Sequence, residues 1–384
     1  MDPEPVPSYF ECFKAIYSAA IRFFTAEGQQ LSLHHFHTAL QEYCSVSQND
    51  LLLIFGLAVF LTVLRFILSK FVFTPVAKYF KLREINIDKF PESAWKFLYY
   101  LTAWSAVTYL IFSYQDHDYF HRPTHIWADW KPHIVLDPKV YAIYILQLSF
   151  YVHSVYASFF MDHWRKDTLV MVFHHLLTIA LIGFSFGMRY HKIGLLVLFL
   201  HDIADICLEF TKCNVYFKDR NKQFYAIHDR ISTVGFLCFA LSWFMFRLYW
   251  FPLKALYSAC FRLSTSGAAP YAKYDFVLNS LLWILQVLNI YWFMFIVNFL
   301  YKVATGQMKE VDDLREEEVL QKLQEEKSLG NGLGSHANNG KKYTRTKTLV
   351  ESVKNIIIVV NSLWSSLNGV VKRKVGGTMG DHGP

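Results

Sequence analysis

Long apolar runs, each of about the length needed to cross a bilayer, constrain this chain more than any other feature of its sequence. A transmembrane helix needs roughly 20 apolar residues, and inside lipid its backbone has to satisfy its own hydrogen bonds. The composition agrees, because 53% of the residues are hydrophobic and only 18% are charged, whereas soluble domains usually carry more charge. The sequence therefore predicts an all-α polytopic membrane protein with about seven spans, at residues 51–73, 95–114, 139–160, 168–187, 191–211, 231–250 and 276–301.

Charged residues between the spans predict how the chain lies in the membrane. Three connecting segments are rich in Lys and Arg, namely 65–89, 161–167 and 212–230, whereas the N-terminal 50 residues and the loop 115–138 carry mainly acids. Because loops rich in Lys and Arg stay in the cytosol, we expect a lumenal N-terminus and a cytosolic C-terminus. The short turn after the fourth span and the long loop before the last are neutral or mildly against this orientation.

The spans divide the chain into segments with different expected environments. These are a lumenal N-terminal segment (1–50), a first transmembrane helix (51–73), a cytosolic linker (74–91), a domain of six transmembrane helices (92–305) and a cytosolic tail (306–384). The tail starts with a charged, helix-favouring run and continues as polar linker, so we expect it to be largely disordered.

Ionisable side chains within the apolar runs point most directly to a function. Each costs roughly 2.5–3.5 kcal/mol to insert, and such residues usually mark functional sites. The fourth span carries the adjacent His174 and His175, and the fifth carries His201, Asp202 and Asp205.

The depth of these residues, counted along each helix, places them in one layer. At ~1.5 Å per residue, His174 lies about 9 Å and His153 about 12 Å from the cytosolic ends of their spans, and Asp205 and Asp202 lie about 10 and 15 Å from theirs. Asp202 and Asp205 also share one helical face. The pattern predicts a pocket just below the cytosolic surface in which a carboxylate orients an imidazole and fixes its tautomer.

Each polar residue also has a simpler structural interpretation. His174 or His175 alone could be a buried histidine that donates to a backbone carbonyl. For other polar residues in the spans the structural interpretation is the better one. We expect Glu209 to pair with Lys212, Gln286 and Asn289 to bond neighbouring helices, and Arg247 to reach the lumenal interface.

The predicted layer indicates acyl or proton transfer. A histidine with a carboxylate partner can take a proton from an amine or alcohol, or attack an acyl group itself. A site sunk into lipid but open to the cytosol suits substrates with a polar head and a long apolar tail. Arg165 and Lys166, just before the fourth span, could hold phosphates at its mouth, or could simply anchor the helix on its cytosolic side.

No metal is predicted for this layer. The expected spans contain one HH doublet and the chain has no HxxHH repeat, which is too little for a diiron centre, although a mononuclear site that includes an aspartate is left open. Six scattered cysteines predict neither a zinc site nor a disulfide framework.

The stretch "MDHWRKDTLVMVFHHLLTIALIGFSFGMRYHKIGLLVLFLHDIADICLEFTK" (161–212) closely resembles the signature of the ceramide synthases within the TLC-domain family. The shared marks are WRKD at 164–167, HH at 174–175, the Arg189–Tyr190 turn and LHDxxDxxLE at 200–209. Three shorter elements, "FPESAWKF", "FRLYWFPLK" and "DDLREEE", extend the resemblance to about residues 50–318. Most subtypes carry a homeobox-like insert between the first two spans, and only about 20 residues separate those spans here. The chain thus resembles the insert-lacking subtype, which favours stearoyl-CoA.

The resemblance implies a reaction in which a fatty acyl group passes from acyl-CoA to the amine of sphinganine or sphingosine. It identifies 92–305 as the TLC domain and implies residence in the endoplasmic reticulum membrane, with acyl-CoA as co-substrate, no bound cofactor and no nucleic-acid partner. Carried over by residue, the essential histidines of the family fall on His174 and His175, and its acidic pair falls on Asp202 and Asp205. His153, His201, Arg165 and Lys166 follow as supporting or substrate-binding candidates. The resemblance also implies that the loop 251–275 sets chain-length preference, and it allows a homo- or heterodimer with related synthases.

Two mechanisms and two other classes stay open from the sequence. Either His174 attacks the thioester to give an acyl-imidazole, or a histidine acts only as general base for direct transfer. A non-enzymatic TLC-domain lipid sensor or carrier has less reason to keep the layer of His and Asp residues. A seven-span receptor fits poorly, because the ionisable layer lies toward the cytosol and the third span ends in "FFMDHWRKD".

Overall fold

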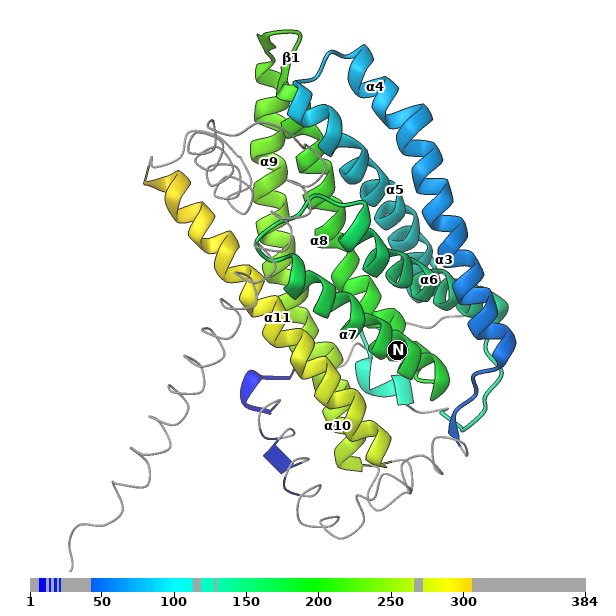
Figure 1. Cartoon of the computed structure of the whole chain (residues 1–384). Helices are drawn as coiled ribbons and strands as arrows, with labels where there is room; N and C mark the ends of the chain where they lie inside the picture. Colours follow the sequence, from blue (N-terminus) through cyan, green and yellow to red (C-terminus); the bar gives the residue numbers. More distant parts are fainter. Residues whose placement is uncertain are drawn as a thin grey trace, which may run out of the picture. The chain divides into compact units, whose positions relative to one another are not determined.

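The computed structural model describes residues 7–11, 14, 17–18, 21, 43–112, 119–127, 130–265 and 272–305. Two compact parts can be distinguished, residues 1–162 with 174–312, and residues 163–173 with 313–384. Nearly all described residues are helical, which confirms the all-α fold (Figure 1). The expected tail 306–384 and most of the segment 1–50 lie outside the described residues.

The helices follow one another with short connections. They are α3 (Gln48–Leu68), continued by the π-helical η1 (Ser69–Phe73) and α4 (Thr74–Tyr79), then α5 (Glu84–Phe112), the 3₁₀ turn η2 (Pro123–Trp127), α6 (Pro138–Phe160), α7 (Thr168–Gly187), α8 (His191–Lys218), α9 (Ala226–Ser242), the π-helical η3 (Trp243–Leu256), α10 (Tyr257–Thr265) and α11 (Ala272–Ala304). A two-stranded hairpin, β1 (Asp219–Arg220) and β2 (Gln223–Phe224), joins α8 to α9.

Five helical stretches among the described residues are long and apolar enough to cross a membrane, namely Gln48–Tyr79, Pro138–Phe160, Thr168–Gly187, Ala226–Arg262 and Asp275–Val303. Of the two other expected spans, 191–211 falls within α8, and 95–114 lies in α5 up to Phe112, with 113–114 outside the described residues. Both of these helices carry more polar residues, and α8 holds His201, Asp202 and Asp205. Such residues are tolerated in a membrane protein where they face other helices rather than lipid.

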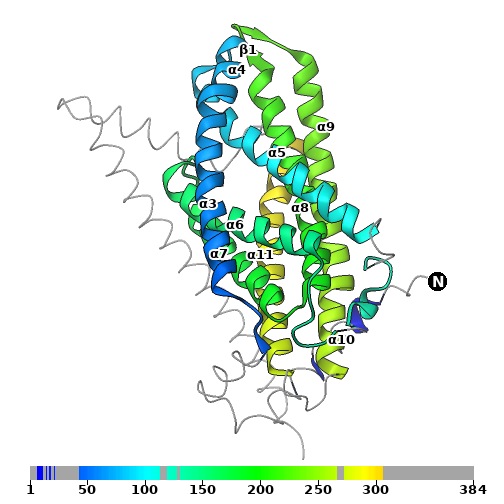
Figure 2. The ribbon, with the colours of Figure 1, turned by 90° about the vertical axis from the view of Figure 1, so that its right-hand side faces the viewer.

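The first long helix is tied to the domain that follows it by polar contacts along α6. Ser47 caps α3, since its hydroxyl accepts from the Asp50 N–H and the Asp50 carboxylate accepts from the Ser47 N–H. The Tyr141 hydroxyl donates to Asp50 at 2.6 Å, and Thr62 contacts His153 at 2.8 Å. The second pair of contacts lies further toward the C-terminal end of both helices than the first, so α3 and α6 run parallel. They lie side by side (Figures 1 and 2).

Backbone contacts join connecting segments at two ends of the helical bundle. At one end the turn after α4 meets the β-hairpin, because the Asn221 N–H donates to the Lys81 carbonyl at 2.8 Å and Leu82 pairs with Arg220 (Figure 2). At the other end the Ser45 N–H donates to the Gly187 carbonyl at 2.9 Å. The two basic segments 65–89 and 212–230 thus meet at one end of the bundle.

One expected boundary is wrong. The span 231–250 is part of a much longer helical stretch, Ala226–Arg262, and residues 251–265 of the expected loop 251–275 are helical. The middle of this stretch, η3, is π-helical and contains Pro252. Proline lacks an N–H and interrupts the usual i to i−4 pattern, and π-helical turns are frequent at functional sites.

Candidate active site

A narrow cavity lies between α6, α7, α8, η3 and α11 and brings together residues from five helical segments. Its volume is about 40 Å³, enough for a few water molecules. The lining is mainly apolar, with a small set of polar side chains. These are Tyr151, His174, Thr178, Ser185, His201, Asp202, Asp205 and Arg247.

His174 lines this cavity with a free ring nitrogen. Its Nδ1 is buried and has no hydrogen-bond partner in the part of the chain that the structure describes. The ring meets Trp292 of α11 edge to face, with 5.3 Å between ring centroids. An imidazole nitrogen that is buried, unpartnered and next to a cavity is available for chemistry on a molecule bound there.

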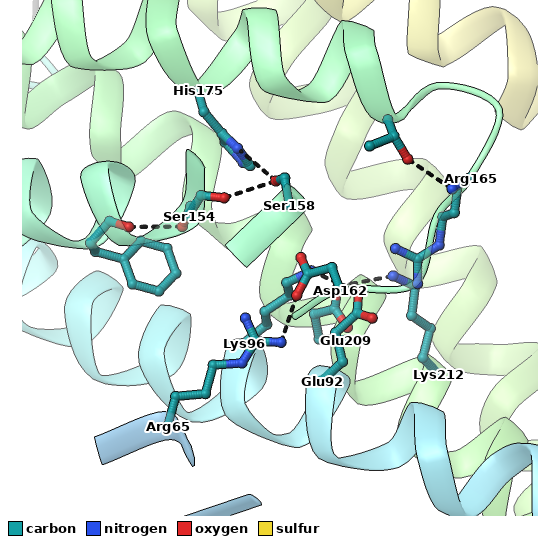
Figure 3. A network of polar contacts seen from close by, with 12 residues as sticks. Arg65, Glu92, Lys96, Ser154, Ser158, Asp162, Arg165, His175, Glu209 and Lys212 are labelled. Carbon is teal, nitrogen blue, oxygen red and sulfur yellow. Dashed lines mark hydrogen bonds and ion pairs between the residues drawn. The ribbon is translucent and has the colours of Figure 1, made fainter. Parts of the chain in front are cut away.

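His175 faces a different side of α7. It does not line the cavity, and its Nδ1 lies 3.3 Å from the Ser158 hydroxyl of α6 (Figure 3). Ser158 donates its own proton to the Ser154 carbonyl at 2.8 Å, so it has to accept from His175. Nδ1 therefore carries the proton of His175, and the serine fixes this tautomer.

His201 has both ring nitrogens engaged in structural contacts. Nδ1 donates to the Val197 carbonyl at 2.9 Å, and Nε2 accepts from the Asn289 amide at 3.1 Å. The ring also meets Phe251 edge to face at 4.8 Å. His201 is a neutral, fully bonded histidine that joins α8 to α11, and Asn289 is the interhelical hydrogen-bonding group expected from the sequence.

The two aspartates of α8 have different partners. Asp202 is 1% exposed and accepts through Oδ2 from the Gln147 amide at 3.2 Å, while its Oδ1 is buried without a partner. Asp205 forms an ion pair with Arg247 at 2.7 Å. The expected hydrogen bond between an imidazole and a carboxylate is thus not formed within the described residues. Asp202 accepts from Gln147 instead, and Asp205 pairs with Arg247.

Arg247 is the site residue that the sequence analysis placed wrongly. It was expected at the lumenal interface, but it is 4% exposed and lines the cavity. The error arose because the sixth span was expected to end at residue 250. With helix continuing to Arg262, position 247 lies well inside the stretch rather than near its end.

His153 lies outside the cavity. Its Nδ1 contacts Thr62 of α3, and its ring meets Trp95 edge to face at 6.0 Å. Its Nε2 is buried without a partner. The structure therefore places this supporting candidate between α3, α5 and α6, apart from the residues that line the cavity.

A buried ion cluster closes the end of α6 (Figure 3). Asp162 accepts from Arg65 of α3 and from Lys96 of α5, and Lys96 also reaches Glu92 at 2.8 Å. Burial and the Glu92 carboxylate act to raise the pKa of Asp162, but the Lys96 and Arg65 charges outweigh them and hold that pKa below its ordinary value. Nearby, Lys212 pairs with Glu209 at 2.9 Å, which confirms the structural interpretation of Glu209.

Arg165 and Lys166 belong to the second compact part and are described only by their local structure. The backbone N–H of Arg165 donates to the Thr168 hydroxyl at 2.7 Å, directly before α7 (Figure 3). Within the described residues no three His, Cys, Asp or Glu side chains are grouped so that they could hold a metal ion.

The helical fold and the buried set of His, Asp and Arg side chains define a polytopic membrane protein with a polar site among its helices. The model of the TLC domain matches residues 89–298. The chain is 42% identical to Ceramide synthase 1 of Homo sapiens over 339 residues, which cover 86% of this chain and 95% of that protein. It is 41% identical to Ceramide synthase 1 of Mus musculus over 337 residues (86% and 95%), and 37% identical to Ceramide synthase 4 of Bos taurus over 223 residues (58% and 53%). The chain belongs to the ceramide synthases of the TLC-domain family.

Proposed function

We propose that this protein transfers a fatty acyl group, preferentially stearoyl, from acyl-CoA to the amine of sphinganine or sphingosine at the cavity lined by His174. Its membership of the ceramide synthases supports the reaction class. The observation that carries the assignment of the site is the pair of unpartnered buried atoms at one cavity, Nδ1 of His174 and Oδ1 of Asp202. Acyl-CoA acts as co-substrate, and no bound cofactor takes part.

The proposed first step is attack of the unprotonated ring nitrogen of His174 on the thioester carbon. A C–N bond forms, the C–S bond breaks, and coenzyme A leaves as a thiolate that takes up the proton released from the imidazole. The product is an acyl-imidazole held inside the protein. The apolar side chains around the cavity have to move apart to admit the acyl chain, because the cavity volume is only about 40 Å³.

The proposed second step is attack of the sphingoid amine on the acyl-imidazole. The amine is protonated at neutral pH and has to lose a proton before it can attack. Oδ1 of Asp202, which has no partner among the described residues, accepts that proton. A new C–N bond forms, the bond to the imidazole breaks, and the second amine proton returns to His174. In this proposal His175 positions its neighbour, since Ser158 fixes its tautomer.

The stearoyl preference rests on the short connection between the first two long helices. Only residues 80–83 separate α4 from α5, which leaves no room for an inserted domain. We also propose residence in the endoplasmic reticulum membrane with a lumenal N-terminus, since the basic loops 65–89 and 212–230 share one end of the bundle. A dimer with itself or a related synthase stays a prediction of the family resemblance.

The purified full-length protein, assayed with sphinganine and acyl-CoA donors from myristoyl to lignoceroyl, tests the proposal. We expect dihydroceramide with a maximum at stearoyl-CoA, and loss of activity in H174A. The matched control is H228A, because His228 is a histidine of α9 that contacts Asn214 and does not line the cavity. Failure to form product from any donor contradicts the function, and an active H174A contradicts the site.

A further inference from the structure

Arg247 is a buried cation inside a membrane protein, and its contacts leave part of its guanidinium unused. Both of its hydrogen bonds are made by Nη2, to Asp205 at 2.7 Å and to the His201 carbonyl at 2.7 Å. Within the described residues its Nε is buried without a partner. A buried arginine in a membrane is costly, so an N–H donor that is left unused at a cavity calls for a physical reason.

The π-helical segment η3 fixes the direction of this side chain. Trp243, Arg247 and Phe251 follow one another at four-residue intervals, which is close to one turn of a helix with i to i+5 hydrogen bonds. Trp243 covers the guanidinium face, with 3.9 Å between Arg247 Cζ and the ring centroid, and Phe251 packs on His201. Asp205 on one edge and Trp243 on one face therefore hold the guanidinium in a single orientation beside the cavity.

A structural ion pair alone explains this arrangement poorly. Replacing a buried ion pair with apolar residues is often neutral or stabilising, because desolvation offsets the attraction between the charges. Arg262 and Asp275 form a second buried pair on the same long helical stretch and α11, with 3.5 Å between Nε and Oδ2, but neither lines the cavity. Arg247 differs in that it shares the cavity with His174.

We propose that Arg247 donates to the carbonyl oxygen of the acyl group and stabilises the negative charge that develops there. This inference rests on the proposed acyl transfer to His174. When the imidazole nitrogen bonds to the thioester carbon, the carbonyl electron pair moves to oxygen. When the C–S bond breaks, that pair returns and the thiolate leaves. A fixed cation in a water-poor site stabilises this charge most as the charge develops. The Nε–H of Arg247 gives a directed donor while Nη2 stays bonded to Asp205, whereas an ammonium offers only a point charge.

Single-turnover acylation of the full-length protein by stearoyl-CoA tests this role. R247K keeps the positive charge beside Asp205 but removes the Nε–H donor. R247Q/D205N replaces the ion pair with a neutral pair. The control, R83Q/D219N, makes the same change at the ion pair between Arg83 and Asp219, whose charged atoms lie 3.6 Å apart and outside the cavity. Thermal unfolding of each variant reports whether the fold is kept, and R247K is the informative variant if the neutral pair fails to fold.

We expect both changes at Arg247 to slow acylation at saturating stearoyl-CoA by about 10²–10³-fold, as for the loss of an oxyanion donor. The half-saturating concentration should change by less than about threefold, because the interaction forms only in the transition state. R83Q/D219N should acylate like the wild type. The inference is overturned if R247K acylates at the wild-type rate, or if only the half-saturating concentration rises. If the wild type itself forms no dihydroceramide, the proposed function fails instead.

Discussion

Replacing Gln147 with leucine should destabilise the protein and slow the amine step more than the acylation step. Gln147 of α6 accepts from the Tyr99 hydroxyl at 3.0 Å and donates to Asp202 at 3.2 Å. It is 1% exposed, so water does not replace it. Leucine leaves the Tyr99 hydroxyl and both carboxylate oxygens of Asp202 without partners. Each buried polar group that loses its partner costs about 1–3 kcal/mol, so two such losses predict about 2–6 kcal/mol of lost stability.

The functional effect of Q147L follows from the role proposed for Asp202. A carboxylate without its only hydrogen bond is no longer held toward the amine, and general base catalysis contributes typically about 10²–10⁴-fold. We expect transfer from the acylated protein to sphinganine to slow by at least about tenfold, while acylation by stearoyl-CoA changes little. Rapid-quench measurement of the two steps, together with thermal unfolding, gives both quantities.

The matched control for Q147L is S149A on the same helix. Ser149 is fully buried, and its hydroxyl bonds only to the Ile145 carbonyl of its own helix, so its loss should affect neither step. A Q147L protein that is as stable as the wild type and transfers to sphinganine at the same rate would refute the reasoning.

Three further predictions concern the surroundings of the site. D162N should cost about 3–5 kcal/mol, since it leaves the buried Arg65 guanidinium without its carboxylate partner, whereas Lys96 keeps Glu92. Because the folded-state pKa of Asp162 is lowered, its stabilising contribution is complete above pH 3.8 and is lost as the pH falls through the folded-state pKa. Acid titration of thermal stability should show this loss in the wild type and not in D162N. G194A should cost about 1–3 kcal/mol in denaturant unfolding, because a Cβ at Gly194 overlaps the Tyr144 hydroxyl. T62V removes the hydroxyl that contacts His153 and should lower the melting temperature. It should leave the turnover number unchanged, since His153 lies outside the cavity. A tenfold loss of turnover would show that His153 contributes to the site.

The helical pattern and the layer of ionisable residues were predictable from the sequence because both depend on spacing along single helices. Depth counted from the ends of two spans placed His174, Asp202 and Asp205 at similar levels, and the structure brings all three to one cavity. The Glu209–Lys212 pair is likewise local, three residues apart on α8. Contacts of this kind need no knowledge of how helices are rotated about their axes.

The partners of the charged groups could not be predicted, because they depend on helix rotation and on one unusual helix. Whether Asp205 faces an imidazole or Arg247 depends on how α8 is turned toward η3. Arg247 itself was placed at an interface because the apolar run was taken to end near residue 250, and the π-helical η3 carries it further. Pro252, inside the apolar run, was the available signal that the helix there departs from regular α geometry. For His153, depth along the helix likewise gave no direction, and its side chain lies outside the cavity.

Intact-protein mass spectrometry after incubation with stearoyl-CoA alone tests most directly whether His174 carries the acyl group. We predict one added stearoyl group on the wild type, mapped to the peptide that contains His174, released on addition of sphinganine and missing in H174A. A wild-type protein that forms dihydroceramide under the same conditions and never gains that mass would contradict the covalent role and leave His174 with general base catalysis only.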